Sequence, residues 1–305
     1  MFSGSNKRED RLAAFLEQHG CAVEEVDIIN DPIKQDLAND AVWLPFLARI
    51  KAGEFEAIFA SPPCRTHSTA RRIRPGPPVL RSPEHVLGFP RKMALQRGIT
   101  EADLEELRLD NLLASRTVEA LFAQYTARGA GGVEQPAKLD EQHAVMYDRE
   151  DFEALFETGF KATALDQCRY GAATAKPTDL RASWIDFSEL ACKCNHDKDW
   201  HWWGKVGGGK WIHTAHPYTA GCKDPNGKDW ATKQQSAYPR ALNEALAKAI
   251  SKAAWTIRRM RRGAAAFDKP AAPSAPASSS GHHQFHTQAP AAPPHTEDHT
   301  TQQAE

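Results

Sequence analysis

Residues 55–64 read Phe-Glu-Ala-Ile-Phe-Ala-Ser-Pro-Pro-Cys, an apolar run that ends in two prolines and a cysteine. Proline lacks a backbone donor and fixes φ, so the Pro62–Pro63 pair ends a strand and stiffens its exit. In open α/β sheets, ligands bind outside the carboxyl ends of the strands. The run therefore predicts that Cys64 lies at such an edge as a candidate nucleophile, although an isolated cysteine is often a small buried hydrophobe.

Helical and strand-like patterns alternate along the chain up to about residue 168. Helical periods cover residues 7–19, 41–51, 110–127 and 148–157, Thr100 opens a further helix, and another runs from residue 238 toward 262. Short apolar runs at residues 21–28, 55–64, 131–136 and 161–168 favour strands. This alternation predicts an α/β fold with a doubly wound, mostly parallel sheet and helices on both of its faces.

The composition limits the classes of function. The chain has 305 residues and is 41% hydrophobic, which supports a real core, and its formal net charge of −1 confines nucleic-acid binding to local basic patches. Six cysteines are too few for a disulfide scaffold, and no apolar stretch approaches the ~18 residues of a membrane span. We expect a soluble intracellular monomer with reduced thiols and no membrane contact, cytoplasmic if bacterial or phage and nuclear if eukaryotic.

Two segments depart from the regular pattern. Between residues 172 and 235 the periodicity is lost and Trp, Gly and Cys cluster. Residues 263–305 are rich in Ala, Pro, Ser, His and Thr, with too little apolar bulk to offset the entropy of ordering, which predicts a disordered tail.

Four short segments at turns and strand ends of the predicted fold occur in this order along the chain: Phe2-Ser3-Gly4, then Pro62-Pro63-Cys64, then Glu134, then Gln167-Cys168-Arg169. This order resembles the cytosine-5 DNA methyltransferases, and in particular their short, divergent phage- and mobile-element-type members. The resemblance covers roughly the first 180 residues and a helix near residue 240. It implies an S-adenosylmethionine-dependent methyltransferase fold, with a catalytic domain at 1–171 and 236–262 and a small irregular target-recognition region at 172–235.

The resemblance also implies a mechanism. The family adds a cysteine thiolate to carbon 6 of cytosine, so Cys64 would be the covalent nucleophile. Glu134 would bond ring nitrogen 3 and the exocyclic amine, and Arg169 would help hold the base and the glutamate. The target base must leave the duplex to reach such a pocket.

On the cofactor side, Phe2, Ser3 and Gly4 match the glycine turn that approaches the methionine end of S-adenosylmethionine. Asp27 matches an acid on the ribose hydroxyls, and Asp36 matches an acid near the adenine. Further cofactor contacts are expected from Pro62 and from Asn243, which follows Tyr238-Pro239 in a segment that resembles the family's last motif. Taken singly, a glycine turn or an aspartate at a strand end more often has a structural role in a turn than a role in binding a cofactor.

DNA is the expected partner. Residues 65–95 form a long loop rich in Pro, Gly and Arg, which in the family closes over DNA beside the extruded base. The predicted DNA-binding residues are Arg65, Ser68, Arg71, Arg72, Arg74, Arg81, Gln167 and Lys176. A solvated basic loop is the alternative interpretation.

Several departures from the family pattern leave other functions open. In the family, a strand leads into the Phe-x-Gly turn. This sequence begins at Met1-Phe2 and does not contain that strand, as expected for an N-terminally truncated member. Gln135-Pro136 replaces Asn-Val, and Gly171 stands in place of a second arginine. One alternative is a DNA-binding pseudo-methyltransferase with a defective cofactor site, and another is the same chemistry on RNA.

A metal site has a weaker signal. Cys192, Cys194 and His196 alternate with other residues, and His201, His213 or Cys222 would complete a zinc ligand set. The spacing is tighter than the usual gap of two to four residues, and no second Cys-x-x-Cys pair follows. Ordinary thiols and histidines are therefore favoured over structural zinc.

Overall fold

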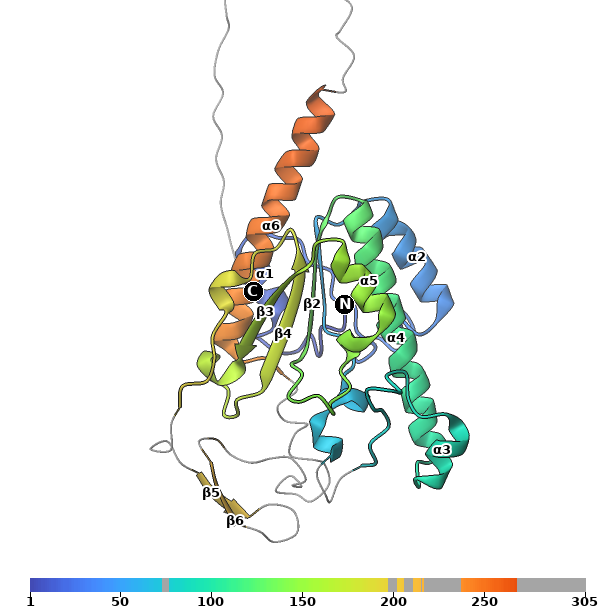
Figure 1. Cartoon of the computed structure of the whole chain (residues 1–305). Helices are drawn as coiled ribbons and strands as arrows, with labels where there is room; N and C mark the ends of the chain where they lie inside the picture. Colours follow the sequence, from blue (N-terminus) through green and yellow to red (C-terminus); the bar gives the residue numbers. More distant parts are fainter. Residues whose placement is uncertain (73–76, 197–201, 206–210, 215, 217–236, 268–305) are drawn as a thin grey trace, which may run out of the picture. The chain divides into compact units, whose positions relative to one another are not determined.

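The computed structural model describes residues 1–72, 77–196, 202–205, 211–214, 216 and 237–267 (Figure 1). Arg74 lies outside these residues, as does the predicted tail from residue 268 on. Met1–Ala264 form one compact unit, which contains the sites considered below. None of the described helices combines the length and the apolar character that crossing a bilayer requires.

The centre of this unit is an open four-stranded sheet. Its strands are β1 (Ala57–Ala60), β2 (Ala130–Pro136), β3 (Lys161–Asp166) and β4 (Pro177–Ser183), in the spatial order β1-β2-β4-β3. β1 and β2 are parallel, whereas β4 is antiparallel to both of its neighbours. The α/β class is confirmed, but a mostly parallel, doubly wound sheet is not, because the described strands form one parallel and two antiparallel pairings.

β4 is the strand that the sequence analysis missed, and it lies within the predicted recognition region of residues 172–235. Thr178, Leu180 and Ala182 are buried at alternate positions, as expected for a strand between two others. The sheet domain therefore extends past residue 171. Because β4 inserts between β2 and β3, it moves the end of β3 one strand away from the end of β2.

Six α-helices are described: α1 (Leu12–Gln18), α2 (Asp40–Lys51), α3 (Arg91–Gln96), α4 (Glu101–Thr126), α5 (Glu150–Glu157) and α6 (Arg240–Phe267). α4 is one continuous helix where the sequence predicted two. It begins with a capping box, in which the Thr100 hydroxyl accepts from the Asp103 amide and the Asp103 carboxylate accepts from the Thr100 amide. α6 extends past residue 263, where the tail was predicted to begin.

The helices cover both faces of the sheet, as predicted (Figure 1). On one face α2, α4 and α5 enclose an apolar cluster that includes Trp43, Leu121 and Phe152. On the other face α1 and α6 pack against the sheet through Phe15 and Leu246. Side chains of β1 point alternately to the two faces of the sheet, with Ile58 in the first cluster and Phe59 packed against the second. The short strand is therefore packed on both faces, which fixes the position of residues 61–64 that follow it.

Short elements complete the description. The 3₁₀ segments are η1 (Arg65–His67), η2 (Thr69–Arg72), η3 (Met146–Asp148), η4 (Gln167–Tyr170) and η5 (Ser188–Leu190), and β5 (Trp202–Lys205) pairs with β6 (Trp211–Thr214) as an antiparallel two-stranded sheet. Between β1 and η3, the loop of residues 77–99 packs on the start of α4 through its own small apolar cluster.

The chain start lies beside β1. The Met1 ammonium group donates to the Phe59 carbonyl at 2.9 Å, and the Phe2 amide donates to the Val26 carbonyl at 2.7 Å. No strand is assigned at residues 21–28, where one was predicted. These contacts place the turn of Phe2 to Gly4 next to the carboxyl end of β1.

Candidate active site

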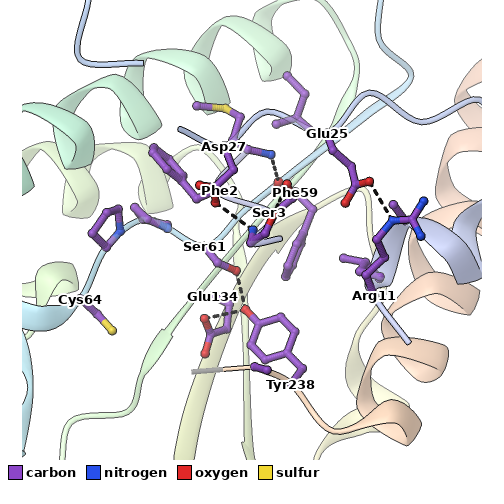
Figure 2. A pocket seen from close by; sticks show the side chains of 18 of the residues that line it. Phe2, Ser3, Arg11, Glu25, Asp27, Phe59, Ser61, Cys64, Glu134 and Tyr238 are labelled. Carbon is purple, nitrogen blue, oxygen red and sulfur yellow. Dashed lines mark hydrogen bonds and ion pairs between the residues drawn. The ribbon is translucent and has the colours of Figure 1, made fainter. Parts of the chain in front are cut away.

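A cavity of about 1440 Å³ opens at the carboxyl ends of β1 and β2 (Figure 2). Most of the predicted site residues line it, from the catalytic, the cofactor and the DNA-binding sets alike. These are Phe2, Ser3, Gly4, Asp27, Asp36, Pro62, Cys64, Arg65, Ser68, Arg71, Glu134, Lys176 and Asn243.

Cys64 and Glu134 are neighbours because β1 and β2 are parallel. Ala60 pairs with Val133, so both strands leave the sheet at the same edge. The stiff Pro62–Pro63 pair then carries the chain to Cys64. Gln135 fixes this exit, since its buried side-chain amide donates to the Pro62 carbonyl at 2.9 Å. The prediction that Cys64 lies at the carboxyl edge of the sheet is confirmed.

Glu134 is 7% exposed, and Tyr238 is its hydrogen-bond donor in the cavity. The Tyr238 hydroxyl lies 2.7 Å from Glu134 Oε2 and also hydrogen-bonds to the Ser61 hydroxyl (Figure 2). Tyr238 thus links the ends of both parallel strands to the start of α6. Burial, followed by the neighbouring carboxylate, raises the pKa of Tyr238 well above its usual value, so the phenol stays a donor.

The Cys64 thiol is protonated in the ligand-free protein. Burial, followed by the negative charge of Glu134, raises the pKa of this thiol to about 11. Lys176 acts in the opposite direction and lowers it. The Lys176 ammonium group also lies 5.5 Å from the centre of the Tyr238 ring, at the same end of the cavity. A nucleophilic role for Cys64 therefore requires that a proton leaves the thiol once a ligand is bound.

Next to the carboxyl end of β1, part of the cavity wall is a turn closed on a carboxylate (Figure 2). The Gly4 amide donates to Asp27 Oδ2 at 2.8 Å, and Asp27 Oδ1 accepts from the Ile29 amide. Gly4 has a φ of +76°, a left-handed conformation that favours glycine, and a Cβ there would meet no atom within 4 Å. The turn therefore presents open backbone to the cavity.

Asn243 and Asp36 reach the cavity from other elements. Asn243 is buried at the start of α6, where its amide nitrogen donates to the Asp10 carbonyl at 2.7 Å and its Oδ1 has no hydrogen-bond partner. Asp36 accepts from the Ala38 amide at 2.9 Å. This oxygen is itself buried, so it is an unmet acceptor behind the cavity wall and not one that is exposed to the cavity.

A buried polar network supports the segment just after Cys64. The Thr66 hydroxyl donates to Asp110 of α4 at 2.8 Å and accepts from the Arg81 guanidinium at 2.7 Å. Asp110 is 1% exposed and Arg81 4%. Burial lowers the pKa of Arg81 to about 9, which reflects the cost of holding its charge inside. The network fixes η1, and with it the direction of the chain at Cys64.

The predicted DNA-binding arginines divide into two kinds. Arg71 and Arg81 are buried; Arg71 binds the Arg65 carbonyl and Glu106 of α4, so both arginines hold the loop together from inside. Arg65 and Arg72 are exposed, and they pair with Glu106 and Asp140 at 3.2 Å and 2.7 Å. Of the predicted DNA-binding arginines that the structure describes, Arg65 and Arg72 are therefore the two that face outward.

The Arg81→Met variant tests the internal role of this arginine. Because it removes the buried guanidinium that bonds Thr66 and offsets the charge of Asp110, we expect a loss of about 3–5 kcal/mol in the free energy of unfolding. The Arg72→Ala variant breaks an exposed ion pair and should cost less than about 1 kcal/mol. Urea unfolding of both variants measures the difference, and equal losses would contradict the assignment.

Besides Arg72 and Arg81, two further predicted residues, Gln167 and Arg169, do not line the cavity. Arg169 is exposed on η4, where it hydrogen-bonds to Asn195, and it does not line the cavity. Gln167 is buried, with its amide donating to the Thr178 hydroxyl at 3.0 Å. The inserted strand β4 explains why Arg169 and Gln167 lie apart from Glu134. They belong to η4, which follows β3, and β4 lies between β3 and β2. Cys192, Cys194 and His196 do not line the cavity either.

The sequence analysis did not select Tyr238, Ser61, Gln135 or Asp110 for the site. Tyr238 has the clearest sequence signal, since the Tyr-Pro pair directly precedes a strongly amphipathic helix. Gln135 directly follows Glu134 on β2 and was noted only as a departure from the family pattern. Nothing in the sequence indicates that Asp110, in the middle of α4, reaches the residues after Cys64.

Comparisons of the chain with protein-family models, with characterised proteins and with solved structures gave no match. The case for a family therefore rests on the motif residues and on their arrangement.

Proposed function

We propose that this protein methylates cytosine at carbon 5 in DNA, using S-adenosylmethionine and a covalent bond from Cys64. The observation that carries the proposal is the joint placement of Cys64 and Glu134 at the ends of adjacent parallel strands, in one cavity with the Gly4–Asp27 turn. A thiol and a carboxylate so placed suit attack on a ring carbon with simultaneous polarisation of the ring.

The residues would act in sequence on the base. The Cys64 sulfur forms a bond to carbon 6 while Glu134 relays the thiol proton to ring nitrogen 3, which takes up the electron pair displaced by the attack. Glu134 also accepts a hydrogen bond from the exocyclic amine. Carbon 5 becomes nucleophilic as a result. After carbon 5 has gained the methyl group, its proton is lost to solvent and the Cys64 sulfur leaves carbon 6, which restores the double bond. The proton on ring nitrogen 3 returns to the sulfur through Glu134 and restores the thiol.

The cavity suits a nucleoside cofactor beside a base. S-adenosylmethionine, when bound, would supply the methyl group as an electrophilic sulfonium. The oxygens of Asp27 accept backbone amides from within the turn and keep lone pairs for ribose hydroxyls. A volume of about 1440 Å³ also exceeds the ~300–1,000 Å³ of an ordinary single-ligand pocket.

Burial of the catalytic pair implies that the base is extruded. Glu134 is 7% exposed, so a cytosine stacked in a duplex cannot reach it. Arg65 and Ser68 line the same cavity next to Cys64, where they would meet the phosphates flanking an extruded nucleotide. With a net charge of −1, such contacts supply only a local attraction for nucleic acid.

Tyr238 would position Glu134. The Tyr238→Phe variant removes the donor to a buried carboxylate, and we expect kcat for methyl transfer to fall about tenfold, with little change in KM for the cofactor. The matched control is Tyr170→Phe, because the Tyr170 hydroxyl donates to the Leu190 carbonyl at 2.9 Å outside the cavity lining. The same loss of activity in both variants would remove this role from Tyr238.

The activity itself is tested by transfer of a tritiated methyl group from S-adenosylmethionine. The chain is incubated with duplex DNA, single-stranded DNA or RNA, and the products are digested and analysed for 5-methylcytosine by mass spectrometry. The proposal expects label in deoxycytidine. Label in cytidine alone would assign the chemistry to RNA. Binding of DNA without any label would favour the pseudo-methyltransferase.

A further inference from the structure

Four metal-ligating side chains meet away from the cavity: Cys168, Cys194, His196 and His216. Their ligand atoms, two sulfurs and two imidazole nitrogens, all lie within 4.8 Å of one another. The sequence analysis had considered Cys192, Cys194 and His196. The structure leaves Cys192 out and adds Cys168 and His216, which are 26 and 22 residues away from Cys194.

The distances fit a tetrahedral metal. Zn–S bonds of ~2.3 Å and Zn–N bonds of ~2.0–2.1 Å place tetrahedral ligand atoms about 3.3–3.8 Å apart. The Cys194 sulfur lies 3.4 Å from His196 Nδ1 and 3.2 Å from His216 Nε2. The two imidazole rings are perpendicular, at 88°, with centres 5.0 Å apart. The nitrogens therefore approach one sulfur from separate directions.

The surrounding backbone orients the ligands. The His216 Nδ1 lies 3.1 Å from the Ala173 carbonyl; an N–H there leaves the lone pair on Nε2, the atom that faces the sulfurs. The Cys194 amide donates to Asp166 Oδ2 at 2.6 Å, and the Asp166 amide donates to the Cys192 carbonyl at 2.9 Å. Residues 192–194 are thus fixed alongside the end of β3, directly before the η4 segment that carries Cys168.

We infer that Cys168, Cys194, His196 and His216 bind one zinc ion. Two thiolates and two imidazoles are a ligand set that selects Zn²⁺, and four protein ligands close the coordination sphere, as in structural sites. Binding forms two Zn–S and two Zn–N bonds and releases the two thiol protons to solvent.

The inferred zinc site has a clear structural consequence. His196 and His216 flank the segment that holds β5 and β6, while Cys168 belongs to η4. The ion would fasten both ends of this segment to the sheet domain beside Gln167 and Arg169. A Zn²⁺ ion supplies stability here that a region with few aliphatic side chains lacks. The inference does not depend on the function of Cys64.

Metal content and cobalt substitution test the site. The full chain is equilibrated with Zn²⁺, dialysed and analysed by inductively coupled plasma mass spectrometry, and we expect about one zinc per chain. After chelation, added Co²⁺ should give the visible bands of a tetrahedral ion and a thiolate charge-transfer band. Cys194→Ser and His216→Ala should lose zinc, whereas Cys192→Ser, which changes the cysteine two positions away, should keep it.

The same experiment can overturn the inference. Native protein without stoichiometric zinc, or an octahedral cobalt spectrum without thiolate bands, would exclude the site. Equal retention of zinc in Cys194→Ser and Cys192→Ser would exclude these ligands. If Cys194→Ser does not fold, hydrogen exchange of the native chain decides: chelation should speed exchange at residues 194–196 and leave β1 unchanged, and no change at 194–196 would contradict the site.

Discussion

Replacing Cys64 with alanine is expected to lower the rate of methyl transfer by about 10³-fold or more, since removal of a covalent nucleophile leaves only binding and positioning. The fold should survive, because Cys64 is half-buried on a segment held by Gln135 and Thr66. Methyl-transfer rates under single-turnover conditions, with circular dichroism for the fold, measure the effect.

The chain supplies a matched control for this substitution. Cys21 lines the same cavity and is also half-buried, but the charges that act on its thiol are those of Glu56 and Arg258 and not that of Glu134. Cys21→Ala should keep the methyl-transfer rate within about twofold of the unsubstituted chain. Comparable losses in Cys21→Ala and Cys64→Ala would show that cavity packing, and not a nucleophile, underlies the effect.

The second large effect is on the reactivity of the thiol. With a pKa of about 11, Cys64 is almost wholly protonated at pH 7, and its alkylation by iodoacetamide should rise about tenfold per pH unit from pH 7 to pH 10. The negative charge of Glu134 helps to raise this pKa, so Glu134→Gln lowers it and should speed alkylation at any pH below 10.

Glu134→Gln should at the same time slow methyl transfer by about 10²-fold or more, because the amide cannot exchange a proton with ring nitrogen 3. Faster alkylation of Cys64 together with slower methyl transfer in Glu134→Gln would separate the electrostatic role of Glu134 from its role in proton transfer. Peptide mass spectrometry gives the alkylation rate at Cys64, with Cys21 as the internal reference. An unchanged or slower alkylation of Cys64 in Glu134→Gln would contradict the coupling.

The sequence predicted best what depends on short segments. The apolar run into Pro62–Pro63 and the turn into Glu134 are local signals, and parallel pairing of these strands brings Cys64 and Glu134 to one edge. The sequence analysis did not predict β4, because Thr178, Leu180 and Ala182 alternate over only seven residues within a segment where the helical period is lost after Tyr170. That omission also explains Arg169, which was expected beside Glu134.

Other features depend on contacts between distant residues. An arginine in a basic loop looks the same in the sequence whether it faces DNA or a buried acid. Arg71 points inward because it binds Glu106 of α4. Arg81 points inward because it binds Thr66, which in turn binds Asp110 of α4. The metal-ligand cluster is similar, since Cys168 and His216 lie 26 and 22 residues away from Cys194 in the sequence. Tyr238 meets Glu134 across 104 residues, a separation at which no periodic pattern gives information.

Covalent trapping tests the central proposal most directly. DNA in which the target carries 5-fluorocytosine is incubated with the chain and S-adenosylmethionine; fluorine replaces the proton that must leave carbon 5, so the covalent adduct accumulates. The account predicts an adduct of protein and DNA that maps to the peptide of Cys64, requires the cofactor, persists in Cys21→Ala and is lost in Cys64→Ala. An adduct at another residue, or retention of DNA with no adduct, would contradict it.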